Sequence, residues 1–257
     1  MSRRVIYDCT PDFAAREKFL GELLGYKKIQ LRKSTFVESK TQLDALAILV
    51  DPMESLGLLP QFTSRSQDVE KMQFFDTVVY SGGRLWPNCF YRHAFKDLVF
   101  SKCPSLNTRL RCYLAGEHPL LLPAIDAFSK LGISQYCWIT KNTAAVEALI
   151  RLAKSIFIGL NIEVMKTMEL TLQANNGCVV INGVVDPSES DILDDLAYLN
   201  FLDHPGLIVD LESSVPVEWG TTEDATQGYP KASRSDLLKM YDTILMKEIS
   251  LLVANKT

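Results

Sequence analysis

The chain alternates between short apolar runs and longer segments in which apolar residues recur every three or four positions. Short runs bounded by turn residues predict strands, and the longer period predicts amphipathic helices. We expect strands at 5–7, 28–31, 45–50, 77–80, 112–115, 136–139, 162–164, 179–182 and 207–210. We expect helices after Thr10-Pro11 and over 64–71, 119–131, 143–158 and 235–253.

The first helix has the clearest boundary signals. Thr10 is expected to be its N-cap and Pro11 to occupy its first turn, and Gly25 is expected to end it. Its core-facing side chains are expected to be Phe13, Phe19, Leu20, Leu23 and Leu24.

From Arg111 onward, strands alternate regularly with helices. Parallel strands joined by right-handed helical crossovers produce this pattern. We therefore predict an α/β protein with an N-terminal α/β substrate-type domain at 1–104 and a doubly wound, Rossmann-like parallel-sheet domain at 105–234. The expected hinges are 100–110 and 212–234, and helix 235–253 is expected to pack back on one of the domains.

Composition narrows the class of protein. Apolar residues make up 47% and charged residues 23%, an ordinary globular balance that excludes a disordered or low-complexity chain. The net charge of -4 and the scattered basic residues argue against direct nucleic-acid contact. No apolar stretch approaches the roughly 18 residues of a membrane span, and the six cysteines stand singly, as expected of reduced thiols in an intracellular protein.

Several segments, in order, resemble motifs of the shikimate/quinate dehydrogenase family. Asp76 to Leu85 is similar to the family's "NTVV…G-x-L", with Phe95 at the end of its "NTDGxGF", and Ile48 to Glu54 is similar to "NVTxPxK". The remaining matches are Cys9-Thr10-Pro11 to "SxSP", Lys141-Asn142-Thr143 to "NRT", and Val179 to Asn182 to "VVINAT". The resemblance covers about residues 5–212, and it implies a two-domain dehydrogenase with a nicotinamide cofactor and a small hydroxy-acid ligand.

The chain departs from that family at the positions that carry the chemistry. The resemblance places Glu54 where the family has a catalytic lysine and Tyr91 where it has a catalytic aspartate, with Cys89 in place of an asparagine. Glu54 cannot supply a cation to an alcohol oxygen, and Tyr91 cannot carry a negative charge at neutral pH. Because Glu54 and Tyr91 replace the two catalytic residues of the family, we assign no catalytic residue. The ligand cleft implied by the resemblance is completed by Asp8, Thr10 and Asp51, and Asp8 is expected to repel a carboxylate.

The expected cofactor turn departs as well. A dinucleotide needs glycines so that backbone N–H groups can approach its pyrophosphate. Here the turn reads Gly116-Glu117-His118-Pro119, which keeps one glycine, adds bulk and removes an N–H donor. A carboxylate about 5 Å from a phosphate costs about 3 kcal/mol at an effective dielectric constant near 20. We therefore expect no cofactor, with NAD or NADP as the alternative. Lys141, Asn142 and Asn182 are further candidate cofactor contacts.

The three histidines are scattered, and the sequence shows no clustered metal ligands, so no metal site is expected. His118 and His204, each followed by proline, are expected in loops, and Asp191, Asp194 and Asp195 are expected at a helix N-terminus.

Two functions follow as hypotheses. The first is a non-catalytic descendant of the dehydrogenase fold that senses a small hydroxy acid or binds a protein partner, as the dehydrogenase-like region of the fungal quinate-pathway repressor does. Such a protein would be cytoplasmic, or nuclear as part of a transcriptional regulator. The second is an NAD(P)-dependent oxidoreductase with relocated chemistry, in which Tyr91 is the acid. A purely structural interaction module is a third hypothesis.

Overall fold

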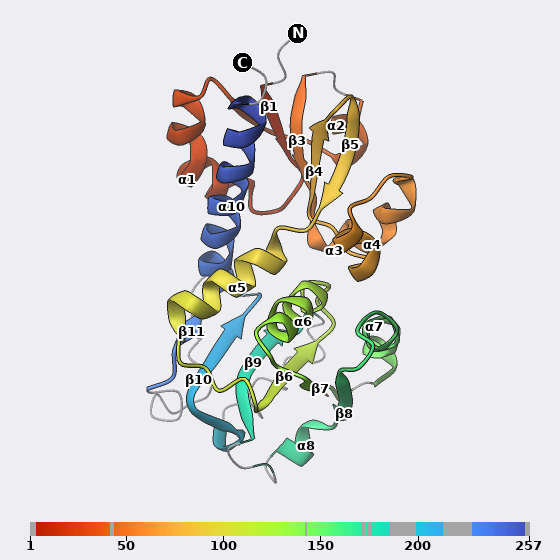
Figure 1. Cartoon of the computed structure of the whole chain (residues 1–257), viewed down its shortest axis with the longest axis vertical. Helices are drawn as coiled ribbons and strands as arrows, with labels where there is room; N and C mark the ends of the chain where they lie inside the picture. Colours follow the sequence, from red (N-terminus) through yellow and green to blue (C-terminus); the bar gives the residue numbers. More distant parts are fainter. Residues whose placement is uncertain are drawn as a thin grey trace. The chain divides into compact units, whose positions relative to one another are not determined.

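The computed structural model describes residues 4–41, 44–141, 143–170, 173, 176–185, 199–212 and 228–254 (Figure 1). Its contacts divide it into two compact units. Unit 1 comprises Met1–Tyr91 with Tyr241–Thr257, and unit 2 comprises Arg92–Met240. The domain limits given above, 1–104 and 105–234, stay a prediction. No helix in the described residues is long and apolar enough to cross a membrane.

Unit 1 contains a five-stranded mixed sheet in the order β2-β1-β3-β4-β5. The strands are β1 (Val5–Asp8), β2 (Gln30–Lys33), β3 (Ala45–Leu49), β4 (Thr77–Ser81) and β5 (Arg84–Asn88). β1, β2 and β3 are parallel, and β4 and β5 add two antiparallel pairs. All five residues of β3 are buried, as its continuous apolar sequence predicts for a central strand.

Short helices follow the strands of unit 1. They are α1 (Phe13–Tyr26), α2 (Phe36–Ser39), α3 (Pro52–Leu58), the 3₁₀ turn η1 (Leu59–Gln61) and α4 (Gln67–Met72). Three begin at residues whose side chains accept a backbone N–H: Thr35 for α2, Asp51 for α3 and Ser66 for α4. The sequence did not predict α2 or α3, because each is only about one or two turns long.

The predicted limits of α1 were wrong. Its N-cap is Asp12, which makes no side-chain cap bond, because Thr10 belongs to a buried polar network described below. The helix continues through Gly25 to Tyr26. Phe19 and Leu23 are about half exposed, and the buried face is formed by Arg16, Leu20 and Leu24. The apolar period predicted the wrong buried face because one of the buried residues, Arg16, is charged.

Unit 2 is built on a six-stranded parallel sheet in the order β11-β10-β9-β6-β7-β8. The strands are β6 (Arg111–Gly116), β7 (Gln135–Ile139), β8 (Asn161–Met165), β9 (Gly177–Gly183), β10 (Leu202–Asp210) and β11 (Lys231–Ala232). With β6 as the first strand, this is the 3-2-1-4-5-6 order of a doubly wound sheet. The predicted Rossmann-like topology is confirmed.

The helices and turn of unit 2 are α6 (Leu121–Lys130), α7 (Thr143–Ile156), α8 (Thr167–Leu170) and η3 (Leu199–Phe201). Two helices contribute to both units: α5 (Tyr91–Lys102) starts on the last residue of the first part of unit 1, and α10 (Arg234–Ala254) passes into unit 1 at Tyr241. α5 was not predicted. The C-terminal part of α10 runs beside α1 in unit 1 (Figure 1), joined to it by an ion pair between Arg16 and Asp242.

Candidate functional site

One edge of the unit 1 sheet gathers the residues that the sequence places in a ligand cleft. Asp8 pairs with Leu49, Leu49 with Thr77 and Thr77 with Asn88, so four strands meet at this edge. Thr10, Asp51, Glu54, Cys89 and Tyr91 all follow directly from these strand ends. The carboxyl ends of parallel strands are where α/β proteins place their functional groups.

Arg16 occupies the buried side of this edge, and no sequence pattern indicated it. Its Nη1 lies 2.7 Å from Asp8 Oδ2 and donates to Thr10 Oγ1 at 2.9 Å, and its Nε lies 2.7 Å from Asp242 Oδ1. The Thr10 hydroxyl donates to Asp8 Oδ1 at 2.7 Å. All four side chains are at most 5% exposed.

The charges in this network decide what Asp8 can do. Burial opposes the charge on Arg16, but Asp242 and Asp8 outweigh it, so the pKa of the guanidinium is raised. One guanidinium balances two carboxylates incompletely, and burial raises the pKa of Asp242 to about 6. Asp8 is paired with Arg16, and the expectation that it repels a carboxylate ligand stays a prediction.

A second buried cluster surrounds Asp76. Its carboxylate accepts the N–H groups of Phe90 at 3.0 Å and Tyr91 at 2.9 Å, and the Thr77 hydroxyl at 2.8 Å. Because these two N–H groups lie at the start of α5, Asp76, which precedes β4, caps that helix. Burial raises the pKa of Asp76 to about 6.

Tyr91 is held by the same cluster. Its ring stacks on Tyr241 of α10 with ring centroids 4.5 Å apart, and the Tyr241 hydroxyl is hydrogen-bonded to Thr77 Oγ1. Tyr91 and Cys89 are both buried. The position that the resemblance assigns to a catalytic carboxylate is therefore part of the aromatic packing of unit 1.

Asp51 and Glu54 lie on α3 at the same edge. Asp51 Oδ1 accepts the Met53 N–H at 3.0 Å, which caps the helix. Glu54 is exposed in the first turn, where a carboxylate complements the helix dipole. Asp51 and Glu54 thus have local structural roles, and their charge does not favour an anionic ligand.

In unit 2 successive strands are added on one side of β6 as far as β8 and then on its other side from β9, so the strand order reverses between β6 and β9. Doubly wound proteins bind ligands in the crevice at such a point. The candidate cofactor turn, Gly116 to Leu121, lies here and packs on the end of β9. A Cβ atom added at Gly116, where φ is +83°, would lie 2.3 Å from the Gly183 carbonyl oxygen. Conversely, a Cβ at Gly183 would lie 2.9 Å from the Cβ of His118.

Every backbone N–H of residues 117–121 is accounted for within the protein. The Glu117 and His118 N–H groups donate to the Gly183 carbonyl at 3.0 and 2.9 Å, and Pro119 has none. The Leu120 N–H donates to His118 Nδ1 and the Leu121 N–H to the His118 carbonyl, both at 3.0 Å. A phosphate would need these donors, so its binding requires the turn to rearrange.

His118 lies in the loop between β6 and α6, as expected, and its side chain is buried there. It is 1% exposed, and burial lowers its pKa to about 3, assisted by the charge of Arg234. The neutral ring accepts at Nδ1, so its proton is on Nε2, which lies 3.6 Å from Glu212 Oε1. Glu117 turns its Oε1 to the Val185 N–H at 3.1 Å.

Two other candidate cofactor contacts lie near the ends of β7 and β9. Lys141 is exposed after β7, and Asn182 is buried in β9, where it donates to Asp210 Oδ1 at 3.1 Å and accepts the Val184 N–H at 3.2 Å. Asn142, Asp191, Asp194 and Asp195 lie outside the described residues. In the described residues, no three His, Cys, Asp or Glu side chains are grouped as metal ligands.

Comparisons with known proteins agree with this architecture. No family profile and no curated protein match the sequence. Among solved structures, quinate dehydrogenase from Corynebacterium glutamicum in complex with NAD matches with a TM-score of 0.71 over 98% of this chain and 99% of that chain, at 12% identity. The chain has the shikimate dehydrogenase fold.

Two shikimate 5-dehydrogenases show the same likeness. The protein from Listeria monocytogenes, in complex with shikimate and NAD, matches with a TM-score of 0.72 at 10% identity, over 97% of this chain and 96% of that chain. The protein from Thermus thermophilus, in complex with NADP(H) and shikimate, matches at 0.69 and 12% identity, over 96% and 93%. Identities this low establish the shikimate dehydrogenase fold and leave activity to be argued from the residues.

Proposed function

We propose that this protein uses the shikimate dehydrogenase fold without NAD(P)-dependent hydride transfer, as a regulatory module that senses a ligand or binds a protein. The observation that carries the proposal is the Gly116 to Leu121 turn, whose N–H groups are bonded within unit 2. Glu54 and Tyr91 also support the proposal. Glu54 does not provide the positive charge, and Tyr91 does not provide the negative charge, that the resemblance requires at these positions.

The turn does not fit a pyrophosphate as it stands. The N–H groups of Glu117 and His118 share one acceptor, the Gly183 carbonyl, and the Glu117 carboxylate lies beside them. Binding a dinucleotide would break these bonds and place negative charge near Glu117. We therefore propose that the protein has no nicotinamide cofactor.

Isothermal titration with NAD and with NADP tests this proposal. Both titrations are expected to be silent at millimolar concentration, with the Corynebacterium glutamicum quinate dehydrogenase as the positive control. The triple variant E117A/H118G/P119G tests whether the turn is the reason that NAD and NADP do not bind. It removes the Glu117 charge and the His118 side chain, and it restores an N–H at position 119. Binding by the unaltered protein, or reduction of NAD or NADP with quinate or shikimate, would overturn the proposal.

The polar groups of unit 1 favour the protein-binding version of this function. Asp8, Thr10 and Asp76 use their oxygen atoms on partners within unit 1, so they offer little to a small hydroxy acid. Thermal-shift titrations with quinate, shikimate and dehydroshikimate separate the two versions. A ligand at 100 times its Kd adds about 2.7 kcal/mol to the free energy of unfolding, so stabilisation by any of them would favour metabolite sensing.

An NAD(P)-dependent oxidoreductase is the second candidate, because similar solved structures are complexes with NAD or NADP(H). It would have to use other residues, such as Tyr91 as the acid. This candidate predicts turnover that Tyr91→Phe abolishes, whereas the non-catalytic function predicts none in either protein.

A further inference from the structure

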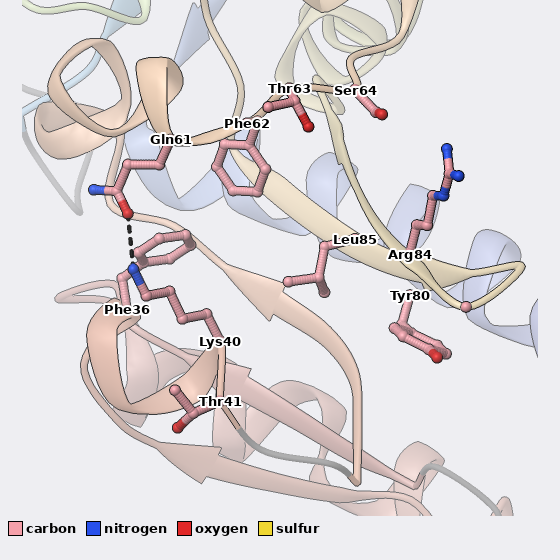
Figure 2. Close-up of a pocket in the computed structure, with 11 residues that line it drawn as sticks. Phe36, Lys40, Thr41, Gln61, Phe62, Thr63, Ser64, Tyr80, Arg84 and Leu85 are labelled. Carbon is pink, nitrogen blue, oxygen red and sulfur yellow. Dashed lines mark hydrogen bonds between the residues drawn. The ribbon is translucent and has the colours of Figure 1, made fainter.

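A pocket in unit 1 lies away from the candidate site. It has a volume of about 710 Å³ and lies between α2, the segment after η1 and the β4–β5 hairpin (Figure 2). Volumes of roughly 300–1,000 Å³ are typical of sites for small molecules. Tyr80 pairs with Leu85 near the hairpin tip, whereas the candidate site lies at the Thr77–Asn88 end of the same two strands.

The walls of this pocket are fixed by hydrogen bonds. A capping box between Thr35 and Glu38 holds α2, which begins at Phe36 and has Lys40 as its C-cap. Arg65 donates to the carbonyls of Phe62 and Leu59 at 3.0 and 3.1 Å and so fixes the segment that provides the opposite wall. These bonds organise the wall before any ligand arrives, which lowers the entropic cost of binding.

The hairpin fixes the third wall. Gly82 and Gly83 have φ values of +58° and +83°, as in a type I′ turn, and Ser81 pairs with Arg84 across it. This two-residue turn sets the register of β5 and therefore the positions of Arg84 and Leu85.

The lining combines polar and apolar surface with two positively charged side chains. Phe36 and Phe62 pack edge to face with centroids 5.9 Å apart, and Leu85 and Tyr80 add to the apolar surface. Lys40 and Arg84 lie on two sides of the pocket (Figure 2), and the described lining residues include no acidic side chain. Lys40 Nζ donates to Gln61 Oε1 at 2.9 Å, which positions one ammonium group at the rim.

We propose that this pocket binds a small organic anion, a carboxylate or phosphate attached to an apolar ring. The ring would lie against Leu85 and the exposed parts of Phe36 and Phe62. The anionic group would be bound by Lys40, and Arg84 on the other side of the pocket would add positive charge at a longer distance. Guanidinium and ammonium groups bind carboxylates and phosphates by charge-assisted hydrogen bonds. The site is independent of the function proposed above, since none of its residues belongs to the candidate site.

Calorimetric titration of the full chain with matched probes tests the site. Phenyl phosphate and benzoate supply both the ring and the charge, inorganic phosphate supplies only the charge, and benzyl alcohol supplies only the ring. We expect at least one of the two ring-bearing anions to bind more tightly than inorganic phosphate and benzyl alcohol. The ratio between phenyl phosphate and benzoate identifies the preferred anionic group.

Charge-removing variants locate the binding. Lys40→Met is expected to weaken binding of the preferred anion about tenfold, as for the loss of one partly exposed charge contact, and Arg84→Met is expected to weaken it less. Lys18→Met, on the exposed face of α1, is the matched control and is expected to have no effect. Silence with both ring-bearing anions, equal binding of benzyl alcohol, or equal affinity in all variants would overturn the proposal.

Discussion

At the residue scale, the turn after β6 depends on glycine for two separate reasons. Gly116 has a positive φ, and its Cα hydrogen faces the Gly183 carbonyl where no Cβ fits. The same contact lets the N–H groups of Glu117 and His118 reach that carbonyl. The structural reason for glycine at position 116 is therefore the close packing of the end of β6 on the end of β9.

Gly116→Ala is expected to be much more destabilising than Gly82→Ala. Both glycines have positive φ, which costs an alanine about 1–2 kcal/mol, but an added Cβ at Gly82 meets nothing within 4 Å. The clash at Gly116 adds about 1–3 kcal/mol. Urea denaturation of the two variants measures the difference, and equal costs would contradict the close approach.

His118 makes the free energy of unfolding depend on pH. Its pKa is about 3 in the folded protein and about 6.5 when unfolded, so below pH 6.5 the unfolded chain binds the extra proton. Its contribution to stability therefore falls as the pH falls, by about 2 kcal/mol between pH 7 and pH 5.

The measurement compares the wild-type protein with His118→Asn, whose side-chain oxygen can still accept the Leu120 N–H. The raised pKa values of Asp76 and Asp242 act in the opposite direction between about pH 4 and pH 6, and the comparison removes their shared effect. A difference in the free energy of unfolding that stays constant from pH 7 to pH 5 would show that His118 titrates normally.

At the element scale, the buried ion network joins α1, β1 and α10. Arg16 is 226 residues from Asp242 in the sequence, yet the two are bonded at 2.7 Å. A helical period could place Leu20 and Leu24 in the core but gave no reason to bury an arginine between apolar neighbours. Likewise, α5 escaped prediction because the residue that caps it, Asp76, precedes β4.

Arg16→Met is expected to lower the free energy of unfolding by about 3–5 kcal/mol, because it leaves Asp8 and Asp242 buried without a counterion. The variant R16M/D8N/D242N removes the uncompensated charges and is expected to recover part of the loss. Arg151→Met is the control, since its pair with Glu147 is exposed and contributes less than about 1 kcal/mol. Chemical denaturation gives all three values, and a cost for R16M as small as for R151M would refute the network's importance.

At the scale of the whole molecule, each unit has its own sheet and core, and α10 contributes to both. Leu237 and Tyr241 are fully buried and about one turn apart on this helix, but they belong to different units. The boundary between the units therefore lies within a continuous helix, where composition gives no linker signal.

Substitutions one turn apart are expected to loosen different units. Tyr241→Ala removes the stacking on Tyr91 and the bond to Thr77, and it is expected to cost about 3–5 kcal/mol and reduce hydrogen-exchange protection in β1 and β3. Leu237→Ala is expected to cost about 2–5 kcal/mol and to reduce protection in β6 and β9. Loss of protection in the same strands for both variants would contradict the division into units.

The sequence by itself determined the α/β class, the parallel doubly wound sheet and the main strands. These depend on apolar runs and helical periods, which are local properties of the chain. Only the tertiary structure decided that Arg16 pairs with Asp8, that Asp76 caps α5, and that the turn after Gly116 has two of its N–H groups bonded to β9. Hydrogen bonds and ion pairs between distant residues leave no periodic signal, so the chemistry of these sites becomes visible only when the folded chain brings the partners together.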